Sequence, residues 1–283
     1  RHNKKGNIPF SDCFFAPCSD TCPIAQDIPA YMELVSKGQY REALSLIMTK
    51  NPLPHITGTI CPHTCMSSCT RSFYETPLQI RQAKLQAAIK GYEAVYEAFT
   101  VQKDPEAAKK SIAVVGGGPA GIAAAFFLSR AGAKVTMFTA SEEPGGIPLS
   151  VIPSFRIPED AVRKDVSFLR KAGVTIRTKE RIDSCDVLSG YETVVLAVGA
   201  TKSGELQLAG DPAINAITFL KDFKKSGGKL EIGKKVVVIG GGNTAMDTAR
   251  AAIRTKGVSE VSLVYRRDVR NMPADEEELK EAL

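Results

Sequence analysis

The chain has 283 residues, enough for about two domains, and its 43% hydrophobic and 24% charged residues indicate a folded protein, not a disordered one. Its net charge of +6 is spread thinly: residues 1–110 carry 13 Lys and Arg against 10 Asp and Glu, and the remainder carries 24 against 21. Because there is no basic tail or stripe, the sequence argues against a nucleic-acid partner. The longest apolar runs are far shorter than the roughly 20 residues of a membrane-spanning helix.

The N-terminal part, residues 1–110, is predicted to be a helical, cysteine-rich domain with a polar linker at its end. The chain begins at Arg1 without a visible secretory leader, so an N-terminal piece is expected to be missing. Apolar residues recur at helical spacing in short stretches between residues 28 and 52. They do so again over residues 77–99, which predicts one long helix with proline in its first turn.

Six of the seven cysteines lie before residue 70 in two clusters, which predicts a metal or redox site in an intracellular, cytoplasmic protein. The clusters are CFFAPCSDTCP and ICPHTCMSSC, and they contain Cys13, Cys18, Cys22, Cys61, Cys65 and Cys69. A cysteine separated by three residues from a Cys-Pro pair, as in Cys18 and Cys22-Pro23, is typical of ferredoxin-type ligation, whereas structural zinc sites more often show two-residue spacing. Iron–sulfur ligation is therefore the favoured interpretation, and zinc is the alternative.

Two residues near or beyond these clusters are given no ligand role. His63 could complete a zinc site, but it is predicted to be a solvent-facing loop residue. Cys185 stands alone in the second half of the chain and is predicted to be a small buried hydrophobic residue.

Residues 111–200 alternate strand and helix patterns, which predicts a parallel sheet with a dinucleotide-binding turn. The sequence SIAVVGGGPAG places G-x-G-x-x-G directly between a strand and a helix, with its glycines at Gly116, Gly118 and Gly121. These glycines allow a tight turn, close approach of the backbone to a pyrophosphate, and close helix–strand packing. Thr139 stands where an acid would bind the ribose, so either its hydroxyl or a neighbouring carboxylate, Glu142 or Glu143, would have to replace that acid.

Residues 235–283 repeat this pattern and predict a second dinucleotide-binding unit. VVVIGGGNTAMD contains the G-x-G-x-x-A variant at Gly240, Gly242 and Ala245. The next strand ends in Arg266 and Arg267 instead of an acid, which favours the 2′-phosphate of NADP(H) over NAD(H); an exposed arginine pair without this role is the alternative. Because 49 residues are too few for a complete unit of ~100 residues, the second unit is expected to be truncated.

Taken in order, the motifs carry a family resemblance. Two cysteine clusters and a long helix precede VVGGGPAG, PGGIP, IPSFRIP, VVLAVGA, VVVIGGGNTAMD and YRRDVRNMPADEEE. This arrangement resembles the glutamate synthase small subunit and its relatives, among them the N-terminal half of dihydropyrimidine dehydrogenase, the NADH-dependent ferredoxin:NADP oxidoreductase and, most similar in its cysteine segment, the selenate reductase flavoprotein group. The resemblance covers nearly the whole chain. It implies an oxidoreductase in which electrons pass from NADPH through FAD to [4Fe–4S] clusters, one or two in number, and on to a partner subunit or fused domain.

The resemblance also implies site residues. For FAD they are Ile60, Gly116, Gly118, Pro119, Ala120, Gly121, Thr139, Gly145, Gly146 and Arg156. For NADPH they are Gly240, Gly242, Asn243, Thr244, Arg266 and Arg267. One cluster would be bound by Cys13, Cys18 and Cys69, and the other by Cys22, Cys61 and Cys65.

The sequence departs from this family at two expected ligand positions. Phe10 replaces a cysteine, and Lys84 replaces a carboxylate or amide on the long helix. Each cluster therefore lacks one of the family's ligands, which Gln82 or Gln86 would have to supply unless a cluster is three-iron, labile or absent.

The prediction is thus an α/β chain with a helical iron–sulfur domain (1–110), an FAD-binding Rossmann-like domain (111–234) and an incomplete NADP(H)-binding one (235–283). No residue is assigned to acid–base catalysis. Two alternative functions make other demands on the sequence. A flavin-dependent disulfide reductase needs a cysteine pair beside the flavin, and Cys185 is the only cysteine after residue 69. A zinc-stabilised scaffold with vestigial dinucleotide folds would contain zinc and no flavin.

Overall fold

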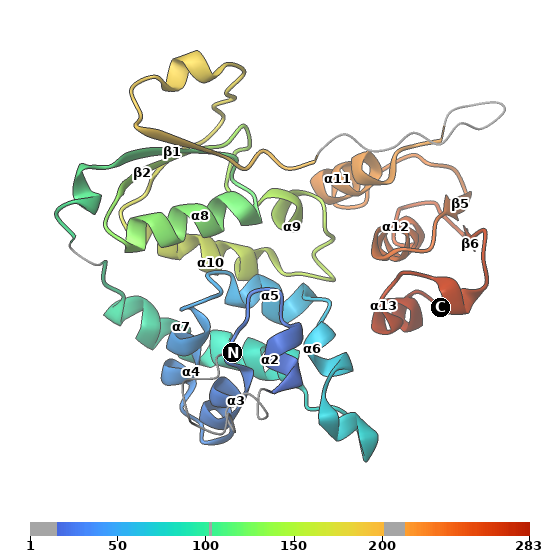
Figure 1. Ribbon diagram of the computed structural model, residues 1–283. Helices are drawn as coiled ribbons and strands as arrows, with labels where there is room; N and C mark the ends of the chain where they lie inside the picture. The colour runs from blue at the N-terminus through green and yellow to red at the C-terminus, as the bar shows by residue number, and fades with distance from the viewer. Residues whose placement is uncertain (1–15, 102–103, 201–212) are drawn as a thin grey trace.

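A computed structural model describes residues 16–101, 104–200 and 213–283, and it shows a helical region followed by two parallel sheets with flanking helices (Figure 1). The predicted fold class, a helical domain followed by two Rossmann-like units, is confirmed. The helical region contains α2 (Pro17–Thr21), α3 (Ile28–Ser36), α4 (Tyr40–Ile47), α5 (Pro54–Ile60), α6 (Thr64–Ser67), η1 (Thr70–Phe73), α7 (Ile80–Ala98) and η2 (Ala107–Lys109).

The long helix α7 begins three residues later than predicted. The Ile80 N–H donates to the carbonyl of Leu78 in a tight turn, so Pro77 lies outside the helix. From Ile80 onward, buried residues recur every three or four positions and pack against α4 and α5. Gly91 is required at one of these contacts, because a Cβ there would lie 2.4 Å from the carbonyl oxygen of Tyr40.

The first sheet has the strand order β3-β2-β1-β4, and all its strands are parallel. Its elements in chain order are β1 (Ser111–Val115), α8 (Pro119–Arg130), β2 (Lys134–Phe138), α9 (Gly146–Ser150), α10 (Glu159–Lys171), β3 (Thr175–Arg177), η3 (Cys185–Leu188) and β4 (Thr193–Leu196). This is the order in which a Rossmann-type unit begins, and the crossover helices α8 and α10 cover one face.

The helical region and this first sheet share one hydrophobic core. Helices α8 and α10 lie between the sheet and the helical region (Figure 1), and the core runs from Leu44 and Ile56 through Phe168 to Val114 and Met137. Helices α4, α5 and α7 of the helical region therefore pack directly in a core shared with the glycine-turn unit, and α5 leads into Cys61.

A buried carboxylate fixes α5 within this interface. Asp165 of α10, 1% exposed, accepts the backbone N–H groups of His55 and Ile56 at 3.1 and 2.9 Å, and it lies 2.8 Å from Nδ1 of His55. It thereby satisfies free donors at the first turn of α5. Burial raises the pKa of Asp165, and the hydrogen bonds from His55 and Ile56 oppose that shift.

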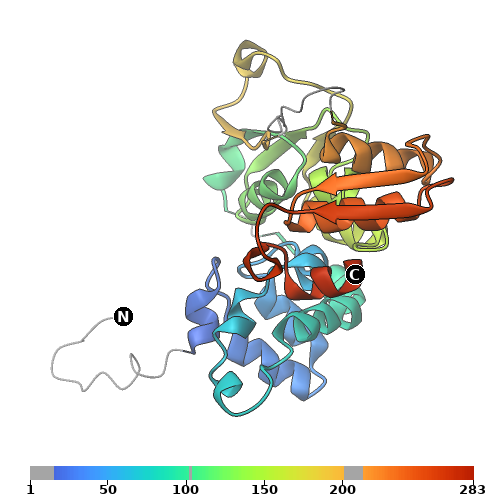
Figure 2. The same cartoon turned by 90° about the vertical axis from the view of Figure 1, so that its right-hand side faces the viewer.

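The second unit contains α11 (Ala216–Ser226), β5 (Lys235–Ile239), α12 (Asn243–Ile253), β6 (Glu260–Val264), η4 (Val269–Asn271) and α13 (Glu276–Ala282). Strands β5 and β6 are parallel and pack against α12 (Figure 2). Their other face exposes Val237, Ile239 and Val264. Within the described part of the chain, no helix combines the length and apolar character needed to cross a membrane.

Candidate functional site

At the first glycine turn, backbone segments lie so close together that a residue with a Cβ atom would clash. Gly116 has φ +117°, and a Cβ on it would lie 2.2 Å from the carbonyl oxygen of Ala197. A Cβ on Gly121 would lie 1.8 Å from the carbonyl oxygen of Gly116, so α8 can start directly beneath the turn only with glycine there. Gly118 precedes Pro119 at the start of α8, where backbone N–H groups are free to bind an anion.

A second glycine loop crosses this turn. The Gly145 N–H donates to the carbonyl of Gly117 at 2.7 Å, and a Cβ on Gly146 would lie 2.7 Å from Cα of Gly118. Gly145 and Gly146 have φ of +148° and +58°, a region that favours glycine. The two glycine segments therefore present bare backbone side by side, which is a cradle that fits a pyrophosphate; the exposed Ala120 lies at its edge.

Thr139 follows β2 but is turned inward. Its side chain is 6% exposed, its Oγ1 accepts the N–H of Ser141 at 3.3 Å, and a Cβ on Gly117 would lie 2.9 Å from that oxygen. The two carboxylates considered as replacements are ion-paired, Glu142 with Lys179 and Glu143 with Arg163, both at 2.9 Å. Thr139 thus packs against the glycine turn, whereas Glu142 and Glu143 form ion pairs with basic residues of the chain.

The second glycine turn has the same backbone form but is partly covered. Gly240 has φ +148°, and the ring of Tyr265 packs over Gly241, 2.7 Å from where its Cβ would lie. Asn243 is engaged within the chain, because its Oδ1 accepts the Asp275 N–H at 2.8 Å. Gly242 starts α12, and Thr244 in its first turn is exposed.

Arg266 and Arg267 lie just after β6 and are exposed. Neither forms an ion pair or hydrogen bond with another described residue. Two guanidinium groups without counter-ions at the carboxyl end of this strand suit a phosphate on a ribose bound above the sheet.

Arg156 lies between the two units instead of in an open cavity. Its side chain is 10% exposed; Nη1 lies 2.7 Å from Asp247 of α12, and Nε lies 2.9 Å from Glu278 of α13. The neighbouring Glu277 pairs with Arg81 of α7. Helix α13 therefore joins the first unit, the second unit and the helical region through ion pairs.

The described cysteines form two electrostatically linked neighbourhoods, and Cys18, Cys22 and Cys65 pack against the same hydrophobic core. The thiol of Cys18 interacts electrostatically with that of Cys69, and that of Cys65 with Cys61 and Cys22. Burial raises the pKa of Cys65 to about 11. The ring of Tyr31, 1% exposed, interacts electrostatically with four of these thiols. Cys13 and Phe10 lie outside the described residues.

Lys84 faces the second of these neighbourhoods. It is 4% exposed on the inner face of α7 and interacts electrostatically with Cys61, Cys65 and Cys22. Burial lowers the pKa of Lys84, whereas the three thiols raise it. No hydrogen bond or ion pair joins it to another described residue, which is unusual because buried charges are nearly always paired. An anionic group bound by the thiols would supply the missing partner, so the site fits an iron–sulfur cluster.

Several nearby residues differ from the predictions. His63 is not solvent-facing, because both ring nitrogens are buried without a partner in the described chain, and its φ of +40° turns it inward. Oε1 of Gln82 is likewise buried without a partner, whereas Gln86 is exposed. Cys185 is exposed, not buried, because η3 turns Leu188 inward instead. Ile60 ends α5, packs against the shared core and directly precedes Cys61.

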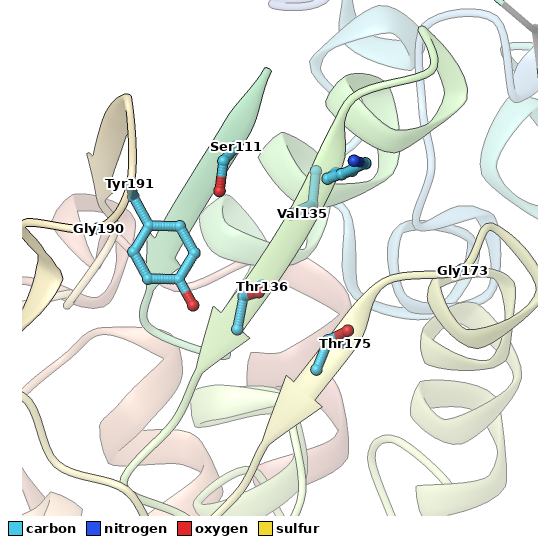
Figure 3. A pocket seen from close by; sticks show the side chains of 8 residues that line it. Ser111, Val135, Thr136, Gly173, Thr175, Gly190 and Tyr191 are labelled. Atoms are coloured by element: carbon cyan, nitrogen blue, oxygen red, sulfur yellow. The ribbon is translucent and has the colours of Figure 1, made fainter. Parts of the chain in front are cut away.

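Across the described residues, no three His, Cys, Asp or Glu side chains lie close enough together to bind a single metal ion. An open depression at the opposite end of the first sheet is also unrelated to the glycine turns (Figure 3). It is lined by Ser111, Lys134, Val135, Thr136, Gly173, Thr175, Gly190 and Tyr191. These residues gather around the amino ends of the strands, whereas dinucleotides bind at the carboxyl ends.

Comparisons with known proteins find two family matches in the chain. Residues 110–283 match the pyridine nucleotide-disulphide oxidoreductase family, and residues 10–95 match dihydropyrimidine dehydrogenase domain II with its 4Fe–4S cluster. The first match indicates FAD and a nicotinamide nucleotide as cofactors, and the second indicates a 4Fe–4S cluster. Although the family name mentions disulphide chemistry, Cys185 is the only cysteine after residue 69.

Relatives of known sequence or structure are oxidoreductases. An oxidoreductase of Escherichia coli K12, YgfK, is 41% identical over 98% of this chain and 27% of its own length. The NADPH-Fe(3+) oxidoreductase subunit beta of Geobacter sulfurreducens is 35% identical over 94% of this chain and 41% of its own length. The chain thus spans less than half of these relatives. Mycobacterium tuberculosis FprA in complex with NADPH, at 24% identity and a TM-score of 0.52 over 61% of this chain and 47% of its own, shares the fold.

The glycine turns, the cysteine neighbourhoods and these matches lead to one conclusion: the chain belongs to the pyridine nucleotide-disulphide oxidoreductase family, with a 4Fe–4S region of the dihydropyrimidine dehydrogenase type in front of its dinucleotide-binding part.

Proposed function

We propose that the chain is an electron-transfer module of the glutamate synthase small-subunit type, which passes electrons from NADPH through FAD to iron–sulfur clusters. One observation carries this proposal: α5, held against the flavin-type unit by Asp165, ends at Ile60 and leads directly into the cluster ligand Cys61. A cysteine ligand is thereby fixed beside the unit that bears the first glycine turn, as transfer between a flavin and a cluster requires.

The residues of this chain bind and orient the cofactors. Gly116, Gly118 and Gly121, with Pro119 and Ala120, hold the FAD pyrophosphate in the proposal, and Gly145 and Gly146 form the crossing loop. Thr139 supports the turn, while Ile60 and Arg156 border the flavin. When bound, the flavin accepts two electrons from the nicotinamide and the clusters accept them singly. No side chain has to transfer a proton for this to occur.

The cluster ligands are proposed as two sets. Cys13, Cys18 and Cys69 form one set, and Cys22, Cys61 and Cys65 form the other. The electrostatic interaction of Cys18 with Cys69, and of Cys65 with Cys61 and Cys22, supports this division. The domain limits 1–110, 111–234 and 235–283, a cytoplasmic location, and a partner subunit or fused domain that accepts the electrons belong to the same proposal.

The cofactor content tests this function directly. Anaerobically purified protein is expected to show flavin absorption over a broad brown shoulder, and to contain several irons and acid-labile sulfides per polypeptide. Iron, zinc and sulfide are assayed on the same sample as the spectrum. A colourless protein that contains zinc would overturn the proposal in favour of a zinc-stabilised scaffold.

The second glycine turn is proposed to bind NADPH through Gly240, Gly242, Asn243 and Thr244, with Arg266 and Arg267 on the 2′-phosphate. Replacing both arginines by alanine is expected to raise KM for NADPH by about tenfold or more, since each charged hydrogen bond contributes roughly 1.5–3 kcal/mol. KM for NADH should hardly change. Steady-state reduction of ferricyanide with each nucleotide measures both constants.

Arg270→Ala is the control for this test, because Arg270 is exposed nearby but pairs with Asp268 at 3.3 Å. It should leave both KM values unchanged. If the double variant raised KM for NADH and KM for NADPH by the same factor, the arginines would not recognise the 2′-phosphate.

A further inference from the structure

Lys84 is a buried lysine that has no ion-pair partner among the described residues. On α7 it shares the inner stripe with Ile80, Ala87, Ala88 and Gly91, all buried apolar residues or glycine. The side chain is 4% exposed, and within the described chain nothing pairs with its charge. Burying an isolated ammonium costs several kcal/mol or more, so an anionic group bound beside Lys84 would stabilise its charged form.

The surroundings identify the chemistry of that partner. Ile80 and Ala87, which flank Lys84 on the inner stripe of α7, lie in the core against which Cys22 and Cys65 pack. Lys84 thus faces the thiols of Cys22, Cys61 and Cys65, which are proposed to bind one cluster, and it interacts electrostatically with them. The other nearby cation, Arg81, is already neutralised by Glu277 and donates to the carbonyl of Cys61 at 3.4 Å. Among the described residues, Lys84 is therefore the cation at this site without a counter-ion, and thiolate-bound iron–sulfur clusters are anionic.

We infer that Lys84 is the built-in counter-charge of the cluster held by Cys22, Cys61 and Cys65, and that it makes this cluster easier to reduce. This inference rests on the proposed function. Each reduction adds one electron, supplied there by NADPH through the flavin, and so adds one negative charge next to a fixed ammonium. Net charge and hydrogen bonds near the sulfurs are known determinants of cluster potential. An ammonium has three N–H donors and no free lone pair, so Lys84 acts on the cluster without binding iron.

Neutral variants separate this role from structural and ligand roles. Lys84→Met keeps a long unbranched side chain without charge, Lys84→Leu is a second neutral variant with no oxygen or nitrogen that could bind iron, and Lys84→Arg keeps the charge. Lys90→Met is the matched control. Lys90 lies on the same helix but is exposed, with its Nζ 4.7 Å from the centre of the Tyr40 ring.

The readouts are iron and sulfide content and a redox titration followed by EPR, all on anaerobically purified full chain. Lys84→Met and Lys84→Leu are expected to keep the wild-type iron content and to lower the equilibrium constant for one-electron reduction of one cluster by about tenfold, equal to about 59 mV. Lys84→Arg and Lys90→Met should leave it within about threefold of wild type, about 28 mV.

Two results would overturn the inference. One is an unchanged potential in both neutral variants at full iron content. The other is loss of iron in both while Lys84→Arg keeps the metal and the wild-type potential, which would make the cation a requirement for assembly instead of a determinant of potential. Wild-type protein without iron would instead refute the proposed function itself, so the two failures can be told apart.

Discussion

Replacing Asp165 by alanine is expected to lower the free energy of unfolding by about 3 kcal/mol, because it leaves a buried network without its acceptor. In the variant, the backbone N–H groups of His55 and Ile56 lose their hydrogen-bond acceptor. Nδ1 of His55 also loses its partner, and the other ring nitrogen of His55 already has none within the described chain. Chemical denaturation measures the loss. Hydrogen exchange should show faster opening of α5 in particular, because α5 loses the residue that caps its first turn.

The control for this prediction lies on the same helix. Asp160 of α10 is 73% exposed and pairs with Lys164 at 3.1 Å, and surface pairs of this kind contribute about 0–1 kcal/mol. Asp160→Ala should therefore change stability by less than about 1 kcal/mol. Equal losses in the two variants would show that the contact between Asp165 and α5 does not hold the helical region in place.

Gly121→Ala should remove most of the bound flavin. The added Cβ would lie 1.8 Å from the carbonyl oxygen of Gly116, so the turn and the start of α8 must move apart. The backbone N–H groups proposed to bind the pyrophosphate would then no longer point toward the same site. We expect the affinity for FAD to fall by at least about tenfold, equal to about 1.4 kcal/mol. The ratio of flavin to protein absorbance after purification, and fluorescence of FAD released by denaturation, measure the loss.

Gly190→Ala controls for the general effect of adding a methyl group. Gly190 precedes β4, and no heavy atom of another residue lies within 4 Å of where its Cβ would be, apart from its two chain neighbours. This variant should retain its flavin. Full flavin content in Gly121→Ala would mean that FAD is not bound at this turn.

The strands and glycine turns could be predicted from the sequence because their determinants are local. A buried strand, a G-x-G-x-x-G turn and the following helix lie within about 20 residues, and the same holds for each cysteine cluster. The early start expected for α7 was wrong because the tight turn at Leu78 has no clear sequence signal.

The buried polar residues were harder to predict because their partners are distant in sequence or absent from the polypeptide. Asp165 receives its hydrogen bonds from residues 110 and 109 positions away. One signal was available, since Asp165 and Lys84 each occupy a position on the apolar stripe of an amphipathic helix. At position 84 the sequence shows only that lysine replaces the cluster ligand expected from the family. The structure adds that this lysine is buried and has no ion-pair partner among the described residues. His63 and Cys185 were misplaced because short loops carry no periodicity from which to predict burial.

The capping of α5 by Asp165 also sets an order of events during synthesis. Domains generally fold as they leave the ribosome, N-terminal parts first. Here the residue that fixes the first turn of α5 is translated 110 positions after His55. We therefore expect the segment carrying Cys61 to reach its final position only once α10 has emerged, so that iron is inserted into a chain whose first sheet is already forming.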